Sequence, residues 1–508
     1  MTLKTDADVL PQAHSKKTSL DKDLDKIVHV EYAARRISQR LVAPGLALLF
    51  LSLTAAFAAS QTGVQTSAVF IVIAAMLGGY MALNIGANDV ANNVGPAVGS
   101  RALTMTGALI IAAVFESAGA LLAGGDVVST ISKGIIDPSL VPDSQTFIWA
   151  MMAALLSSAL WVNLATWIGA PVSTTHSVVG GVMGAGIAAV GFGAVNWTTM
   201  SMIAASWVIS PVLGGVIAAL FLAFIKANII YRDDKIAAAR RWVPLLLATM
   251  AGVFSCYLAM KGLKKVWKAD ATAIAVIGVA TFALCWAIAK PWVHRQSEGM
   301  ENRNQSLRRL FHLPLICSAA LLSFAHGAND VANAVGPLAA ILHAVQSGDI
   351  VAKVGIPVWV MMIGAAGISL GLFLYGPRLI RMVGEQITKM NPMRAYCVAL
   401  SAAITVIVAS AFGLPVSSTH IAVGAVFGVG FFREYYTAKS KRRADYLRAK
   451  RNDSDTALDS DYQAPEEISR RKLVRRAHFT TIIAAWIITV PAAALLSAGL
   501  FLGLTLMQ

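Results

Sequence analysis

Long apolar runs separated by short polar or basic segments fill the chain from residue 41 onwards. These runs lie at 41–60, 68–83, 103–123, 148–168, 201–224, 243–260, 272–289, 313–325, 357–375, 396–412 and 479–504. Most are close to the roughly 20 residues that an α-helix needs to cross a lipid bilayer. The pattern therefore predicts an all-α polytopic membrane protein.

Composition agrees with this fold class. The 508 residues are 56% hydrophobic and only 14% charged, whereas a soluble domain carries about 25% charged residues. The net charge of +15 sits mainly in the N-terminal tail and the loops, as expected for cytoplasmic segments. It is not a nucleic-acid signal. The four cysteines lie in or beside apolar runs without metal-ligand spacing, so we expect them to be reduced core residues.

The polarity pattern also divides the chain into segments. We expect a polar cytoplasmic tail at 1–40, with no apolar core of a signal peptide, a first half at 41–225, a connector with two plain spans and basic loops (226–241 and 290–309) at 226–312, a second half at 313–432, a charged cytoplasmic loop at 433–476 and a final transmembrane helix at 477–508.

One motif occurs twice, and both copies adjoin apolar runs. Residues 86–96 read Gly-Ala-Asn-Asp-Val-Ala-Asn-Asn-Val-Gly-Pro, and residues 327–337 differ only in having Ala334 where the first copy has Asn93. Glycine, asparagine and proline in these positions predict that each helix breaks inside the membrane. Such a break is tolerated only where protein or a water-filled cavity satisfies the backbone.

A second motif is also doubled. Pro-Val-Ser-Thr-Thr-His at 171–176 returns as Pro-Val-Ser-Ser-Thr-His at 415–420, an offset of 244 residues, against 241 for the first motif. Because the motifs keep their order and spacing, they mark two homologous repeats. Duplicated halves with interrupted apolar segments are typical of secondary transporters whose site lies between the repeats, near the bilayer midplane. Spacing alone leaves the repeats either parallel or inverted.

The first motif places acids where lipid normally demands apolar side chains, and buried acids of this kind are usually functional. Asp89 lies three residues before Asn92, and Asp330 before Asn333, so each pair shares a helix face. Carboxylate and amide oxygens suit Na⁺, an aspartate can carry a proton, and amide NH₂ groups suit an anion. The competing interpretation is that these residues cap a broken helix.

The second motif offers hydroxyl groups behind a proline, at a predicted helix start. Hydroxyls and free N–H groups there form an anion site, although simple N-capping and helix packing would use the same residues. His176 and His420 are either proton donors or packing residues. Glu116, a lone acid in the run 103–123, is a cation ligand, a proton carrier or a neutral core acid. Gly180 and Gly184 are interpreted as helix-packing positions.

These doubled motifs resemble those of the inorganic phosphate transporter (PiT) family. The resemblance implies inverted repeats, a homodimer, and symport of phosphate with Na⁺ or H⁺. Carried over by position, the phosphate-binding residues would be Asn88, Asn92, Ser173, Thr174, Thr175, Asn329, Asn333, Ser417, Ser418 and Thr419, and the cation or proton sites, with Na⁺ bound if sodium is coupled, would be Asp89, Asp330 and Glu116. Members often carry a glutamate where this chain has Ala399, which leaves the coupling ion open.

We therefore expect a secondary active transporter that imports inorganic phosphate by cation symport across the cytoplasmic membrane. A sulfate or other oxyanion permease is the nearest alternative, and a passive channel is another. A membrane hydrolase would pair Ser173 or Ser417 with a histidine, but the duplication of both sets argues for a symmetric binding site rather than a triad. No Gly-Lys-Ser/Thr phosphate loop occurs, so we expect neither ATP use nor a resident cofactor.

Overall fold

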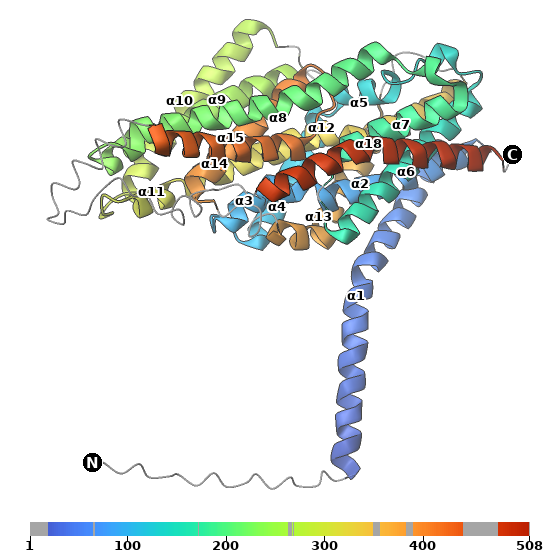
Figure 1. The fold of residues 1–508 in the computed structure, drawn as a ribbon, viewed down its shortest axis with the longest axis horizontal. Helices are drawn as coiled ribbons and strands as arrows, with labels where there is room; N and C mark the ends of the chain where they lie inside the picture. Colours follow the sequence, from blue (N-terminus) through green and yellow to red (C-terminus); the bar gives the residue numbers. More distant parts are fainter. Residues whose placement is uncertain are drawn as a thin grey trace. The chain divides into compact units, whose positions relative to one another are not determined.

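The computed structural model describes residues 19–63, 67–170, 172–262, 267, 269–348, 356–382, 390–439 and 476–506. These residues are mostly helical and contain no strand apart from one isolated bridge between Ile136 and Val195 (Figure 1). Eleven helical segments of this part are long and apolar enough to cross a membrane. The predicted polytopic helical architecture is confirmed.

From α1 to α15 the helices follow one another with short connections. Their bounds are α1 Ser19–Thr62, α2 Ala68–Asn88, α3 Val90–Gly99, α4 Met105–Ala123, α5 Gly125–Lys133, α6 Ser144–Ile168, α7 Thr174–Val190, α8 Trp197–Ile225, α9 Lys235–Tyr257, α10 Ala271–Gln296, α11 Asn304–Leu310, α12 His312–Ser347, α13 Val358–Met382, α14 Pro392–Ala411, α15 Ser418–Lys439 and α18 Arg476–Thr505. Short 3₁₀ turns (η1 Pro138–Leu140, η2 Phe192–Ala194) and π turns (η3 Lys226–Ile230, η4 Leu258–Gly262) complete them.

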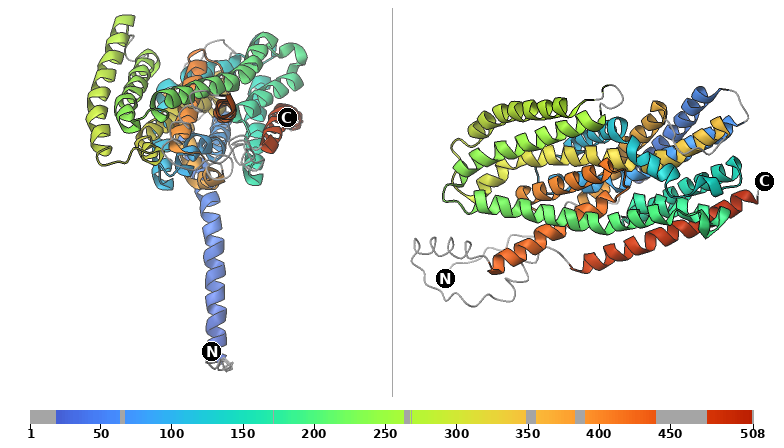
Figure 2. Two further views of the ribbon diagram at one scale, coloured as in Figure 1. Left: turned by 60° about the vertical axis from the view of Figure 1, so that its left-hand side comes forward. Right: turned by 90° about the horizontal axis from the view of Figure 1, so that it is seen from above.

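Two compact units make up the chain, residues 1–49 and residues 50–508. In the first unit, the described residues form the beginning of α1, so the helix starts at Ser19 rather than at the predicted residue 41. The second unit holds all other helices. Its centre is α12, in which 89% of the most apolar 18-residue stretch is buried. The corresponding share is 6% for α10, which stands at the rim (Figure 2).

The two repeats pack across one another through glycines. Helix α2 crosses α13, and a Cβ at Gly86 would collide with the backbone carbonyl of Ile368. Helix α12 crosses α4 in the same way, because Gly327 faces the backbone of Glu116. Glycine lets two backbones approach this closely within a membrane. Each acid-bearing helix is therefore held against a helix of the other repeat.

The predicted helix breaks at the Asn-Asp motifs are largely wrong. Helix α12 runs unbroken through the second motif, and α2 and α3 are separated only by Asp89, whose backbone is still right-handed helical (φ −83°, ψ −33°). The Asp89 N–H keeps its helical bond to the carbonyl of Ile85 at 2.9 Å. The motif therefore contributes side-chain groups to its surroundings rather than freed backbone.

The Pro-Val-Ser motifs are the real interruptions. Helix α6 ends at Ile168 before Gly169, which takes a left-handed φ of 78°, and α7 begins five residues later at Thr174. In the second repeat, α14 ends at Ala411, Gly413 has a φ of 69°, and α15 begins at Ser418. A left-handed backbone favours glycine, which explains why both motifs follow one.

The basic segments are more helical than the sequence predicts. Of residues 226–241, only 231–234 lie outside helical turns, and α10 and α11 take up much of 290–309. Helix α8 also continues through Pro211. Of the predicted loop 433–476, the beginning belongs to α15, the end is the first residue of α18, and residues 440–475 lie outside the described residues. Polar helix ends that extend past the apolar runs account for the differences in the basic segments.

The predicted packing role of the α7 glycines is confirmed. Gly180 and Gly184 meet the backbone of α18 at Val490 and Ala494, and α18 lies along α7 (Figure 2). The matching glycines of the second repeat, Gly424 and Gly428, meet the backbone of α8. The helix starts at Thr174 and Ser418 are thus fixed by equivalent contacts.

Candidate functional site

Both copies of both motifs meet around the carboxylate of Asp89, which is buried. Thr174 at the start of α7 donates a hydrogen bond to Asp89 Oδ2 at 2.6 Å. Thr419 at the start of α15 donates to Oδ1 at 3.0 Å. One acid is therefore held by hydroxyl groups from both repeats, 85 and 330 residues away in the chain.

The inner asparagines extend this cluster across the repeats. Asn92 Nδ2 donates to the hydroxyl of Thr419 at 2.9 Å. Asn333 Nδ2 donates to the hydroxyls of Thr174 and Thr175 at 3.2 and 3.1 Å. Each amide thus reaches the hydroxyl motif of the opposite repeat. We call these residues together with Asp89, Asp330 and Ser418 the central cluster; all of them are buried.

The outer asparagines have a different place. Asn88 Nδ2 donates to Thr166 Oγ1 at 2.9 Å and to the Ala170 carbonyl at 3.3 Å. In the second repeat, Asn329 Nδ2 donates to Ser410 Oγ at 2.8 Å and to the Leu414 carbonyl at 3.2 Å. These matching contacts fasten the segments that precede α7 and α15. Their amide groups position the helix starts rather than point into the central cluster.

The first hydroxyl of each Pro-Val-Ser motif is an N-cap. Ser173 Oγ accepts a hydrogen bond from the backbone N–H of His176 at 3.1 Å, and Ser417 Oγ accepts one from that of His420 at 3.3 Å. The two imidazole rings pack edge to face with centroids 4.3 Å apart, and His176 also lies 3.8 Å from the ring of Trp207. Capping and packing thus describe the outer residues of each motif.

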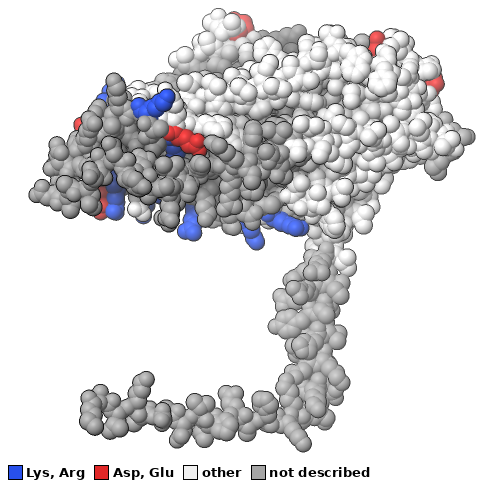
Figure 3. All heavy atoms as spheres, in the orientation of Figure 1, with Lys and Arg blue, Asp and Glu red and all other residues white. Residues whose placement is uncertain are grey.

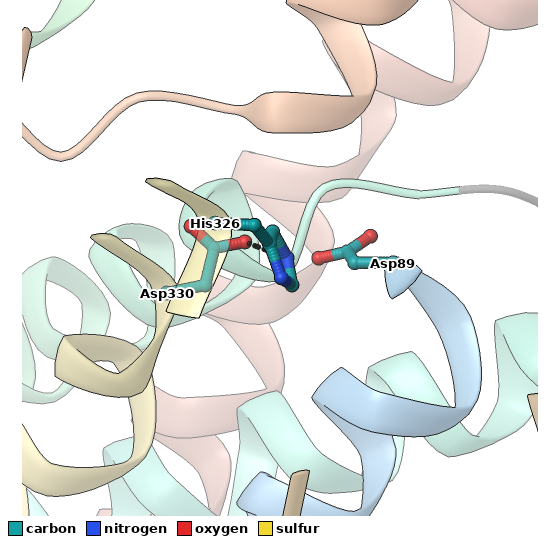
Figure 4. A group of neighbouring side chains, drawn as sticks. All are labelled: Asp89, His326 and Asp330. Carbon is teal, nitrogen blue, oxygen red and sulfur yellow. Dashed lines mark ion pairs between the residues drawn. The ribbon is translucent and has the colours of Figure 1, made fainter. Parts of the chain in front are cut away.

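A second buried network adjoins the central cluster and involves Glu116. Asn93 Nδ2 donates to Glu116 Oε1 at 2.8 Å. His326 Nδ1 lies 2.6 Å from Glu116 Oε2, and its Nε2 lies 2.8 Å from Asp330 Oδ2. Figure 4 shows the imidazole of His326 beside Asp330, with Asp89 across from both. Oxygen and nitrogen atoms of Asp89, His326 and Asp330 lie within 4.8 Å of one another.

Three side chains of this network have no equivalent in the other repeat. Asn93 stands where the second repeat has Ala334, and His326 stands where the first repeat has Ile85. Glu116 has no counterpart, since alignment of the flanking glycines places it opposite Gly364. Sequence reasoning missed His326. His326 directly precedes the second motif. Comparing the two motif copies one residue further upstream would have revealed an ionisable side chain in the second repeat and none in the first.

Because of this network, the two aspartates are inequivalent. Asp89 has two hydroxyl donors, whereas Asp330 faces the imidazole through Oδ2, and its Oδ1 has no hydrogen-bond partner among the described residues. In that part of the chain Ser418 Oγ, which corresponds to Thr174, and Asn333 Oδ1 also lack partners. Buried polar atoms left unpaired cost about 1–3 kcal/mol each, so a ligand that pairs with them is stabilised.

Comparison with known proteins identifies the scaffold. The model of a family described as the phosphate transporter family matches residues 85–497. The chain belongs to this family. It is 45% identical to a Helicobacter pylori protein named "Putative phosphate permease", over 95% of this chain and 98% of that protein. A Pyrococcus abyssi protein of the same description is 33% identical, over 85% and 97% of the two chains.

A solved structure agrees. The chain is similar to "The sodium-dependent phosphate transporter", with a TM-score of 0.74 and 33% identity, over 87% of this chain and 100% of that one. The molecule is accordingly a multi-pass membrane protein of a phosphate-transporting family. The family and the relatives are transporters and not enzymes, so the hydrolase alternative is set aside.

Proposed function

We propose that this phosphate transporter imports inorganic phosphate by symport with a cation bound in the central cluster. The observation that supports this most strongly is the sharing of Asp89 by Thr174 and Thr419, one from each repeat. A site built from both halves changes when the halves move relative to each other. Alternating access in transporters with repeats works in this way.

Phosphate would bind at the starts of α7 and α15. The hydroxyls of Thr174, Thr175 and Thr419 are grouped there with the amide of Asn333, and Ser418 adds a hydroxyl without a partner in the described part of the chain. Hydroxyl and amide donors at a helix N-terminus, where the helix dipole is positive, suit an oxyanion.

A cation is needed because the same cluster is acidic. Asp89 and Asp330 are both buried, and a second negative charge beside phosphate would repel it at short range in a medium of low dielectric constant. Asp330 Oδ1 and Asn333 Oδ1 are oxygen atoms without partners among the described residues, and oxygen ligands suit a hard cation. Na⁺ is our first candidate, in keeping with the name of the similar solved structure, and H⁺ is the alternative.

Glu116 would act one step away from the ligand. Both of its carboxylate oxygens already face protein groups, Asn93 and His326. We therefore assign Glu116 the role of positioning the imidazole that faces Asp330, rather than that of a direct cation ligand. Asn88 and Asn329 would likewise position α7 and α15, and Ser173 and Ser417 would cap them.

Selection of phosphate over sulfate follows from the aspartates of the central cluster. Phosphate carries a P–OH group at neutral pH and can donate a hydrogen bond to Asp89 or to Asp330, whose Oδ1 has no partner among the described residues, whereas sulfate has no proton to donate. Leaving a buried acceptor unpaired is a large penalty for the wrong ligand. The direction of transport, the inverted orientation of the repeats and the homodimer stay predictions.

Uptake by liposomes containing the purified protein tests the proposal. Replacing external Na⁺ with choline at fixed pH should abolish the accumulation of labelled phosphate against its gradient. Accumulation that persists in choline but needs a proton gradient would assign the coupling to H⁺. Phosphate flux that only equilibrates, whatever ion is supplied, would reject symport in favour of a channel.

A further inference from the structure

A basic cavity lies outside the central cluster, at one end of the helices. It has a volume of about 520 Å³ and is lined by the last residue of α3, the turn after it, both ends of the short helix α11, and the beginnings of α12 and α14. Its charged and titratable lining residues are Arg101, Arg308, Arg309, His312 and Arg394. No carboxylate of the described residues lines it.

An adjoining cavity of about 290 Å³ continues this surface. It shares Arg308, Asn391 and Arg394 with the first and adds Lys226 and Arg433. The Lys and Arg side chains visible on the face in Figure 3 gather towards this end of the helices, while the opposite end is almost entirely free of them. Three of the basic segments of the sequence contribute to the lining. Because basic segments of membrane proteins lie mainly on the cytoplasmic side, we expect this end to be cytoplasmic.

The charge of the cavity is not neutralised by the described part of the chain. None of the ion pairs there involves Arg101, Arg308, Arg309 or Arg394. Arginines placed together around one cavity repel one another, and an anion between them removes the repulsion. Their planar guanidinium groups bind phosphate oxygens in pairs.

Arg101 adds an independent observation. Among the non-glycine residues that the structure describes, it is the one with a positive φ, 60°. The left-handed conformation costs an ordinary L-residue about 1 kcal/mol, and glycine would adopt it freely. Strained residues of this kind cluster at ligand sites. The turn therefore places a guanidinium group at the cavity although glycine would fit its backbone better.

We propose that this cavity binds a phosphate group, as a second anion site separate from the central cluster. Helix α3 joins the two sites directly, because it starts beside Asp89 and ends at Gly99 in the cavity lining. Its ten residues correspond to about 15 Å. The phosphate group belongs either to inorganic phosphate on its way between the central cluster and water, or to the headgroup of an anionic lipid.

Arg101→Gly provides the sharpest test, since it removes the charge and relieves the backbone strain together. Binding of labelled phosphate is measured for the protein in nanodiscs of phosphatidylcholine at low salt. We expect a weak, salt-sensitive component in the wild type, and a loss of affinity for it on the order of 10-fold in Arg101→Gly, with no loss of thermal stability. The double variant Arg308→Gln/Arg309→Gln should lose the same component.

The matched control is Arg241→Gln/Arg295→Gln, which removes two exposed charges outside both cavities. It should retain the component. Asp89→Asn should also retain it, which separates this inference from the proposed symport site.

Nanodiscs containing phosphatidylglycerol distinguish the two sources of the phosphate group. If a lipid headgroup is the ligand, this lipid abolishes the free-phosphate component and stays bound in native mass spectra of the wild type, but not of Arg308→Gln/Arg309→Gln. The proposal is overturned if neither phosphate binding nor lipid retention differs between the cavity variants and the control.

Discussion

The crossing of α4 and α12 should tolerate no added atom at Gly327. A Cβ built there lies 2.8 Å from the carbonyl carbon and from the Cα of Glu116, whereas carbon atoms prefer separations of about 3.5–4.0 Å. Gly327→Ala must therefore push the two helices apart by about 1 Å. Because both contacts are backbone atoms, no side-chain rotation can relieve the collision.

The displacement acts directly on the acid network. His326 precedes Gly327, and its Nδ1 lies 2.6 Å from Glu116 Oε2. An extra separation of about 1 Å takes this contact beyond the roughly 3.2 Å limit of a good hydrogen bond. Overpacking costs about 1–3 kcal/mol, and losing a hydrogen bond to a charged group costs about 1.5–3 kcal/mol. We expect a total destabilisation on the order of 3 kcal/mol.

Two measurements check this expectation. Thermal unfolding in detergent should show a lower midpoint for Gly327→Ala. Liposomes containing the variant should take up phosphate at least about 10-fold more slowly, a factor that corresponds to a free-energy change of about 1.4 kcal/mol. Gly119→Ala, on the other side of the crossing, should behave alike because its Cβ would meet the backbone of Phe324. Gly499→Ala is the control, since nothing lies within 4 Å of its added Cβ. Wild-type stability and uptake in Gly327→Ala would refute the reasoning.

Three further substitutions probe the site itself. Thr174→Val removes the donor to Asp89 and should lower both the stability without ligand and the affinity for phosphate, by about 1.5–3 kcal/mol. Ser418→Ala should lower the affinity alone, since its hydroxyl has no partner among the described residues. Phosphate titrations followed by thermal shift separate the two effects, and equal behaviour of both variants would contradict this expectation. Asp89→Asn should weaken transport and relax the discrimination against sulfate, measured by competition of sulfate with labelled phosphate; unchanged selectivity in an active variant argues against the proposed contact. Asn93→Ala, which introduces the residue of the other repeat, should destabilise the protein by about 1.5–3 kcal/mol through its lost bond to Glu116, and an unchanged unfolding midpoint would show that this bond contributes nothing.

The sequence by itself determined the spans and the duplication. Hydrophobic length is a local property, and water-free surroundings leave an apolar run of about twenty residues little choice but a helix. The doubled motifs also indicated which segments carry the chemistry. Local reasoning went wrong at the Asn-Asp motif, where glycine and proline predicted a break, because packing against α4 and α13 supports a continuous helix there.

Only the tertiary structure decided which members of each motif face one another. Asn88 and Asn92 are the same residue type four positions apart, yet one fastens the segment before α7 and the other reaches Thr419. The pairing of Glu116 with His326 joins residues 210 positions apart in the chain. Such partners depend on how two helices cross, and the crossing is set by backbone contact at glycines whose neighbours no single stretch of sequence contains.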